Sequence, residues 1–195
     1  LVPWRSAIDL KEILLKILVT ELGLKTVDDE PGFELSLGGT KSGDSVYFNA
    51  KSDKYKSEGA GSRAEAWQIL SPVRGESHGV DALNRMIQAQ FRKKAFEFAS
   101  ARNRKTPRPM GQEQIIYGDK VINTANRRRK DVYPEAGSLQ YVANGEIGMV
   151  VGQVKYASSG YKGLPWKLEV EFSSQLGYKY GYDAVGWIND GYPFG

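Results

Sequence analysis

The sequence predicts an α+β fold, with helices in the first half of the chain and a small β-barrel in the second. Two segments within the first 100 residues carry apolar side chains at helical spacing. Four short segments rich in β-forming residues follow between residues 113 and 174, separated by turn residues. Asn144-Gly145, a strong tight-turn pair, lies between two of them. Short strands of this number and spacing favour a small barrel.

The first helix is expected at residues 8–22, where apolar side chains recur every three or four positions: Leu10, Ile13, Leu14, Ile17 and Leu18. Gly23 follows at the position where a glycine commonly ends a helix. In the next segment, 28–45, Pro31-Gly32 predicts a turn and the alternation in FELSL predicts a strand. Residues 49–64 are polar and glycine-containing, which predicts a solvated loop or linker.

The middle of the chain predicts a strand followed by a long helix. Residues 66–74 form a short apolar segment that ends at Ser71-Pro72, and residues 79–99 carry one apolar face of helical period. The basic, proline-containing stretch 101–112 then predicts a domain boundary. The last stretch, 175–195, is aromatic and glycine-rich without a clear period, which predicts an incompletely packed tail.

Charge is spread unevenly along the 195 residues, whose net charge is +4. From Arg92 to Lys130 the chain contains 12 Lys and Arg against three acids, a local net charge of +9. The rest of the chain therefore carries −5. A basic block on an otherwise acidic chain predicts contact with a polyanion, and a solvated basic face is the alternative.

Composition excludes several kinds of site. The chain has no cysteine and one histidine, His78, so disulfides, thiol nucleophiles and multi-histidine metal sites are excluded. A reducing compartment, the cytoplasm, is the predicted location. No apolar run is long enough to cross a membrane, and the first ten residues lack the features of a signal peptide.

Four consecutive cations, Arg127 to Lys130, follow a strand-like segment. Four adjacent side chains cannot all point inward, so an exposed basic tip that faces phosphates is predicted. Arginine also stacks on bases and forks onto phosphate oxygens. The same region contains five aromatic residues that are candidates for base stacking, although a core position is the alternative for each: Tyr117, Tyr133, Tyr141, Tyr156 and Trp166.

Three motifs, in this order, resemble RecD-like superfamily 1 DNA helicases of the exonuclease V alpha-subunit type. They are WQILSPVRGESHGVDALNRMIQAQF, YGDKVINTANRRRKDVY and YVANGEIGMVVG. In that family a strand ends in a Ser/Thr-Pro turn, followed by Gly-Val and Leu-Asn-x-x-(Ile/Leu)-Gln, then by GDKV, by an Asn before a charged stretch, and by an NG(D/E)IG turn. The matching positions, within residues 66 to 172, are Ser71, Pro72, Arg74, Gly79, Val80, Leu83, Asn84, Gln88, Gly118, Asp119, Lys120, Val121, Asn126, Asn144, Gly145, Glu146, Ile147 and Gly148.

The resemblance implies a partial RecA-like α/β segment followed by a small SH3-like β-barrel. Residues 66–110 would belong to the second RecA-like motor domain, and residues 111–174 would form the SH3-like insert. Residues 1–65 would be an N-terminal helix and loop region, and the tail 175–195 would return to the RecA-like domain. The Ser/Thr-Pro turn of such helicases lies near the nucleic-acid backbone. The predicted nucleic-acid-binding residues are Ser71, Arg74, Asn126, Arg127, Arg128, Arg129 and Lys130.

The function that the resemblance implies is a nucleic-acid-binding fragment of an ATP-dependent DNA helicase, which contacts the DNA backbone without strong sequence preference. No phosphate-binding lysine loop and no magnesium-binding Asp-Glu pair is present, so ATP and Mg²⁺ are expected only for the parent protein. The chain alone is predicted to need no cofactor and to hydrolyse no ATP. Its predicted partners are single-stranded DNA and the rest of the motor. An unpaired sheet edge would also favour self-association.

Two functions besides DNA binding are compatible with the sequence. A free-standing SH3-like module would bind a protein segment, and the tyrosines of the β region would supply its aromatic groove. An enzyme of another class is the third possibility, but no acid/base pair or triad supports it.

Overall fold

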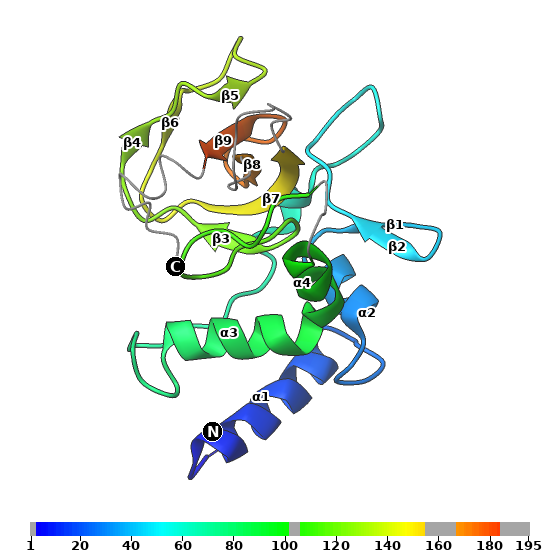
Figure 1. Cartoon of the computed structure of the whole chain (residues 1–195), viewed down its shortest axis with the longest axis vertical. Helices are drawn as coiled ribbons and strands as arrows, with labels where there is room; N and C mark the ends of the chain where they lie inside the picture. Colours follow the sequence, from blue (N-terminus) through cyan, green and yellow to red (C-terminus); the bar gives the residue numbers. More distant parts are fainter. Residues whose placement is uncertain (1–2, 102–105, 155–166, 184–195) are drawn as a thin grey trace.

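A computed structural model describes residues 3–101, 106–154 and 167–183 of the protein. Its helices are α1 (Ala7–Glu21), α2 (Glu30–Ser36), the 3-10 turn η1 (Ala60–Arg63), α3 (Val80–Phe91) and α4 (Lys93–Ser100). Its strands are β1 (Thr40–Ser42), β2 (Ser45–Tyr47), β3 (Lys120–Ile122), β4 (Arg127–Arg128), β5 (Val132–Tyr133), β6 (Tyr141–Val142), β7 (Ile147–Val154), β8 (Lys167–Phe172) and β9 (Lys179–Asp183). The α+β class is confirmed, and Figure 1 shows α1 and α3 at one end and β4, β5 and β6 at the other.

Helix α1 matches the helix predicted at 8–22. Ser6 caps its first turn, since its hydroxyl accepts a hydrogen bond from the Asp9 backbone N–H at 3.2 Å. Gly23 has φ +64 just beyond the last turn, a conformation that a glycine adopts without the steric cost of a Cβ. Leu15 and Leu18 are buried, as the apolar spacing predicts.

The strand predicted within 28–45 is wrong, because residues 30–36 form helix α2. The Asp29 side chain caps this helix by accepting from the Gly32 backbone N–H at 3.0 Å, and Pro31 lies in its first turn. Phe33 and Leu37 are buried while Leu35 is 41% exposed, which fits a spacing of four residues and not of two. The acid and the proline before FELSL were the helix-start signals.

The helix predicted at 79–99 forms as two helices that meet at Arg92, whose φ of −125 and ψ of 18 interrupt the helical path. Consecutive residues point about 100° apart on a helix. Here Phe91 and Arg92 are both buried, and the break allows both side chains to reach the interior. The strand predicted at 66–74 does not form either. Residues 67–71 belong to no strand, because they have no hydrogen-bonded partner strand within the described chain.

The main sheet has the strand order β3-β7-β8-β9-β5, and every pair in it is antiparallel. A β-bulge interrupts the register of β7 and β8 between Val150 and Gly152. The described strands form an open sheet and do not close into the predicted barrel: β3 and β5 lie at opposite edges, and β4 pairs only with β6. Asn144-Gly145 does form a turn, with Gly145 at φ +89, but β6 and β7 on either side of it pair with different strands.

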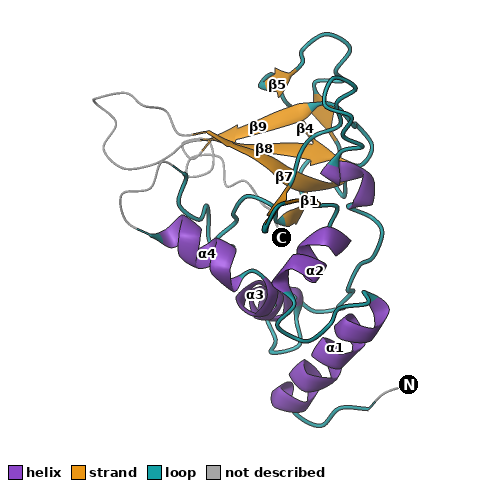
Figure 2. Ribbon diagram, turned by 90° about the vertical axis from the view of Figure 1, so that its right-hand side faces the viewer, coloured by secondary structure: helices purple, strands orange, loops and turns teal. Residues whose placement is uncertain are grey.

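Two buried clusters lie on the two sides of this sheet. One contains Val142 of β6, Val170 of β8 and Tyr180 of β9, so the β4–β6 pair covers one face. The other joins the helices to β7, and its Phe33 and Phe91 rings stack at a centroid distance of 4.5 Å. Figure 2 shows α2, α3 and α4 next to the strands and α1 farther away.

The end of the described chain differs from the predicted tail. Residues 179–183 form strand β9, and both Tyr180 and Tyr182 are buried in the first cluster. Residues 184–195 lie outside the described residues. No helix in the described part of the chain is long and apolar enough to cross a membrane.

Candidate nucleic-acid interface

The four consecutive cations do not form a uniformly exposed tip. Strand alternation separates them: Arg128 and Lys130 are exposed, Arg127 is half-buried, and Arg129 is 8% exposed. The Arg129 guanidinium lies 4.2 Å from the centroid of the Tyr182 ring, and its backbone N–H donates to the Gln140 carbonyl at 2.8 Å. The prediction of a fully exposed run is therefore wrong at Arg129, which packs against the core.

The exposed cations lie beside exposed tyrosines. Arg128 is opposite Tyr141 in the β4–β6 register, and Tyr141 is 41% exposed. Tyr133 is opposite Lys179 in the β5–β9 register; it is 68% exposed, and the Lys179 ammonium lies 5.6 Å from its ring centroid. We use the name basic aromatic surface for these exposed and half-buried residues of β4, β5, β6, β9 and the segment after β4: Arg128, Lys130, Tyr133, Tyr141 and Lys179. Lys179 is also paired with Glu169 at 2.6 Å. Figure 1 shows β4, β5 and β6 at one end of the molecule.

Asn126 has a structural contact in addition to its predicted role. Its side-chain oxygen accepts a hydrogen bond from the Asn144 backbone N–H at 2.8 Å, so it fixes the Asn144-Gly145 turn. Asn123 acts beside it, because its side-chain amide donates to the carbonyls of Ala125 and Ala143, each at 2.7 Å. These bonds hold the segment before β4 against the segment after β6.

Ser71 and Arg74 lie elsewhere in the molecule. The Ser71 hydroxyl donates to the His78 carbonyl at 2.9 Å and closes the loop that precedes α3. Arg74 is exposed on the same loop. Both residues line a groove beside α3, and none of residues 126–130 does. The structure thus divides the predicted site residues into two groups, one at this groove and one at the β4–β6 end.

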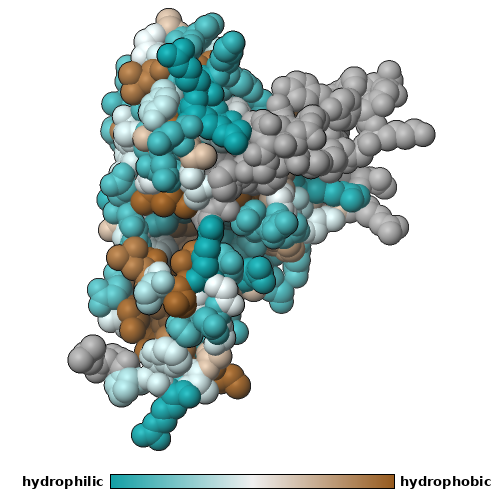
Figure 3. Space-filling view, turned by 90° about the vertical axis from the view of Figure 1, so that its left-hand side faces the viewer, coloured by the Kyte–Doolittle hydropathy of each residue, from teal (hydrophilic) through white to brown (hydrophobic). Residues whose placement is uncertain are grey.

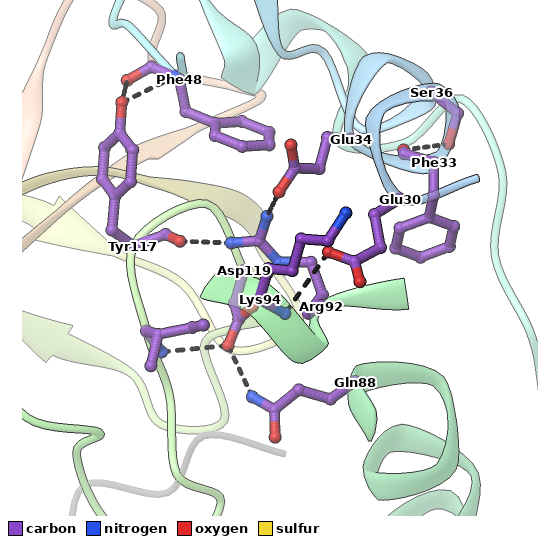
Figure 4. A network of polar contacts seen from close by, with 11 residues as sticks. Glu30, Phe33, Glu34, Ser36, Phe48, Gln88, Arg92, Lys94, Tyr117 and Asp119 are labelled. Carbon is purple, nitrogen blue, oxygen red and sulfur yellow. Dashed lines mark hydrogen bonds and ion pairs between the residues drawn. The ribbon is translucent and has the colours of Figure 1, made fainter. Parts of the chain in front are cut away.

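A buried polar cluster involves a residue that the sequence places in the basic block. Arg92 is 3% exposed and donates to Glu34, to the Asp119 carboxylate at 3.4 Å, and to the Tyr117 carbonyl (Figure 4). Its guanidinium also lies 5.4 Å from the centroid of the Phe48 ring. Arg92 therefore links α2, α3 and the turn before β3, and it is not available to an external polyanion.

Asp119 receives further bonds within this cluster. Its carboxylate accepts from the Gln88 side-chain amide and from the Ile116 backbone N–H, both at 3.0 Å. Burial raises the pKa of the Asp119 carboxyl, and the Arg92 guanidinium opposes that rise. Burial likewise raises the pKa of Glu34.

Tyr117, a predicted stacking candidate, is half-buried, and its hydroxyl exchanges two hydrogen bonds with the Phe48 backbone.

Lys120 is another cation of the basic block that is not freely exposed. Its ammonium lies 4.3 Å from the centroid of the Trp67 ring and donates to the Trp67 carbonyl. Burial lowers the pKa of Lys120 to about 8, because the interior disfavours its charged form. Together with Arg92 and Arg129, it reduces the number of cations that the basic block presents to solvent.

Glu171, on β8, is fully buried and was not predicted as a site residue. One of its carboxylate oxygens accepts from the backbone N–H groups of Lys51 and Gly177 at 2.7 and 2.8 Å, and the other accepts from that of Gly61 at 2.9 Å. Three backbone donors satisfy the charge and tie two loops to the sheet. No sequence pattern indicates this, because the donors lie up to 120 residues away.

Tyr156 and Trp166, the other two stacking candidates, lie outside the described residues. The described residues contain no group of three or more metal-ligating side chains. Comparison with family models, with curated proteins and with solved structures finds no match for this chain.

Proposed function

We propose that the chain is a nucleic-acid-binding part of an ATP-dependent DNA helicase, and that the basic aromatic surface contacts single-stranded DNA. The observation that carries the proposal is the position of Arg128 directly opposite the exposed Tyr141. A guanidinium forks onto phosphate oxygens, and a tyrosine ring stacks on any base. Both interactions tolerate every sequence, so contact with the backbone without strong sequence preference is expected.

Contacts between the motifs support the resemblance to RecD-like helicases. Gln88, from the Leu-Asn-x-x-Ile-Gln motif, donates to Asp119 of the GDKV motif at 3.0 Å. Asn126, before the cationic run, accepts from Asn144 of the NGEIG motif at 2.8 Å. These contacts are consistent with motifs that were retained as one structural unit.

The same proposal covers the finer fold assignment. The β4–β6 pair folded across an antiparallel five-stranded sheet is compatible with an SH3-like insert, and α3 with the preceding Ser71-Pro72 turn would come from the second RecA-like domain. In this arrangement the chain supplies DNA contacts, and ATP with Mg²⁺ would bind to the rest of the motor. Single-stranded DNA and that motor are the proposed partners.

The test is the anisotropy of a fluorescein-labelled oligothymidylate titrated with the chain. R128A/K130A removes two exposed cations of the basic aromatic surface, and K11A/K16A, two exposed cations of α1, is the matched control. The first variant is expected to bind more weakly and the control to bind as the unmodified chain does. Tyr141→Ala removes one stacking platform and should cost about 1–3 kcal/mol of binding free energy. Equal binding by both double variants would contradict the proposal.

A protein-interaction module is the second candidate, because exposed Tyr133 and Tyr141 resemble the aromatic lining of grooves that bind proline-rich segments. A labelled proline-rich peptide in the same assay separates the two functions. Tight peptide binding lost in Tyr141→Ala, together with no DNA binding at low salt, would favour the module.

A further inference from the structure

Residues 67–71 form a surface segment that pairs with no strand of the described chain. Trp67 and Ile69 are half-buried while Gln68 and Leu70 are exposed, which is the alternation of an extended segment. Within the described part of the chain, no backbone N–H or C=O group of Gln68, Ile69 or Leu70 forms a hydrogen bond. An unpaired extended edge is a template for another strand.

A groove of about 450 Å³ lies against this segment. Residues 67–71 form one wall, α3 forms the second with Leu83 and Ile87, and the third comes from Ile115 and Ile122. The side chain of Leu70 is 85% exposed at its edge. On the face in Figure 3, apolar side chains gather at mid-height, between the hydrophilic β4–β6 end and the end formed by α1. The groove thus offers apolar sites directly beside unpaired backbone groups.

The charges of the groove favour an acidic ligand. Arg74, Arg85 and Lys120 line it, and none of them has an ion pair within the described chain. Two acidic residues, Asp81 and Glu113, also line the groove and partly offset these positive charges. The third acidic residue that lines the groove, Asp119, forms an ion pair with Arg92. The Lys120 ammonium contacts the Trp67 ring and carbonyl, so Arg74 and Arg85 are the exposed cations that line the groove.

We propose that residues 67–71 are a docking edge for an extended peptide segment of a protein partner, in which acidic and apolar residues alternate. The segment adds to the edge as a β-strand, through backbone hydrogen bonds to residues 68–70. Its apolar side chains enter the groove beside Leu83 and Ile87, and its carboxylates, which point to the other face of that strand, face the exposed Arg74 and Arg85. Main-chain bonds supply affinity in such pairing, and alternate side chains supply specificity. None of the basic aromatic surface residues lines this groove, so the two proposals stand or fall separately.

The probe is an acetylated, amidated seven-residue peptide that alternates Glu and Val. Residue-level hydrogen exchange of the full chain is followed by NMR with increasing peptide. In the free chain the amides of residues 68–70 should exchange at nearly unprotected rates, and at saturation those that pair should slow at least tenfold. Because alternate N–H groups of a strand point to opposite edges, two N-methylated versions are compared, each blocking one edge. Only one of the two should lose binding.

Two further comparisons test charge and place. A Lys-Val peptide of the same pattern should bind at least tenfold more weakly. Leu70→Asp should weaken the Glu-Val peptide by a similar factor, and Ile8→Asp, which replaces an apolar residue 74% exposed on α1, should not. Both positions are exposed, so neither substitution should unfold the chain, and the amide spectrum of each variant verifies this.

Three results would overturn the proposal. The first is unchanged exchange at residues 68–70 with saturating Glu-Val peptide. The second is equal binding of the Glu-Val and Lys-Val peptides, or no effect of either N-methylation, which would indicate nonspecific apolar adhesion. The third is protection of residues 68–70 that rises with protein concentration alone, because the occupant would then be a second copy of the chain.

Discussion

Replacing Arg92 with methionine should destabilise the protein strongly. The methionine keeps much of the apolar stem that packs near Phe48, but it removes the guanidinium that contacts Glu34, Asp119 and the Tyr117 carbonyl. The side chains of Glu34 and Asp119 are only 16% and 13% exposed, so water replaces little of what they lose. Removing one partner of a buried ion pair costs about 3–5 kcal/mol. We expect a loss in this range in the free energy of unfolding.

The assay is urea denaturation at pH 7, with Lys93→Met as the matched control. Lys93 is the exposed neighbour of Arg92, and its substitution should change stability by less than about 0.5 kcal/mol. Adding E34Q and D119N to R92M removes the unpaired charges, and at least half of the lost stability should return. This recovery would show that the destabilisation comes from two desolvated carboxylates and not from lost packing of the Arg92 stem.

The pH dependence follows from the same cause. Burial raises the pKa of both Glu34 and Asp119, and replacing Arg92 removes the largest interaction that opposes this rise, so both pKa values should rise further. The folded variant then binds protons that the unfolded chain releases, between the ordinary carboxyl pKa and the raised one. Its stability relative to the unmodified protein should therefore rise as pH falls from 7 towards 4. A cost below about 1 kcal/mol, or a difference that widens at low pH, would refute the reasoning.

Three further substitutions test other contacts by the same denaturation. Glu171→Gln replaces an acceptor oxygen with a donor facing a backbone N–H, and should cost about 1.5–3 kcal/mol for each charged hydrogen bond lost; an unchanged midpoint would contradict this. Burial lowers the pKa of Lys120 to about 8, so between pH 8 and 10.5 the folded state binds fewer protons than the unfolded state. The stability of the unmodified protein, relative to that of Lys120→Met, should therefore rise from pH 7.5 to 9.5. An equal stability difference at both pH values would count against burial as the cause. Gly118→Ala should lower the free energy of unfolding more than Gly43→Ala does. Gly118 has φ +84 and its added Cβ would lie 2.5 Å from the Phe48 ring, whereas Gly43 has φ +59 and open space around it. Equal losses would show that the Phe48 ring moves aside.

Local signals sufficed for the elements whose residues decide their own structure. Helix α1 has its cap, its apolar stripe and its terminal glycine within a short range of sequence, so its bounds were predicted to within a residue. The segments that became β7 and β8 were likewise predictable from their β-forming residues. Helix α2 was missed because FELSL satisfies both periods at Phe33 and Leu37, and only Asp29 and Pro31 decide between them.

Other features depend on partners far away in the sequence. Residues 67–71 have the composition of a strand, but a strand needs a neighbour, and the described chain supplies none. Arg92 and Arg129 count as surface cations in any charge tally, yet Glu34 and Tyr182 lie 58 and 53 positions away and draw them inward. Ser71 and Asn126 were predicted from the motifs as nucleic-acid contacts, and their hydrogen bonds to His78 and Asn144 are visible only in three dimensions.

The most direct test of nucleic-acid binding at the β4–β6 end is the salt dependence of oligothymidylate binding. Each phosphate contact contributes about −0.7 to the slope of log K against log salt for a single strand. Arg128→Ala with Lys130→Ala should therefore make the slope shallower by about 1.4, while the K11A/K16A control keeps the slope of the unmodified chain. An R128A/K130A variant that binds with unchanged affinity and slope would show that these cations are only a solvated face.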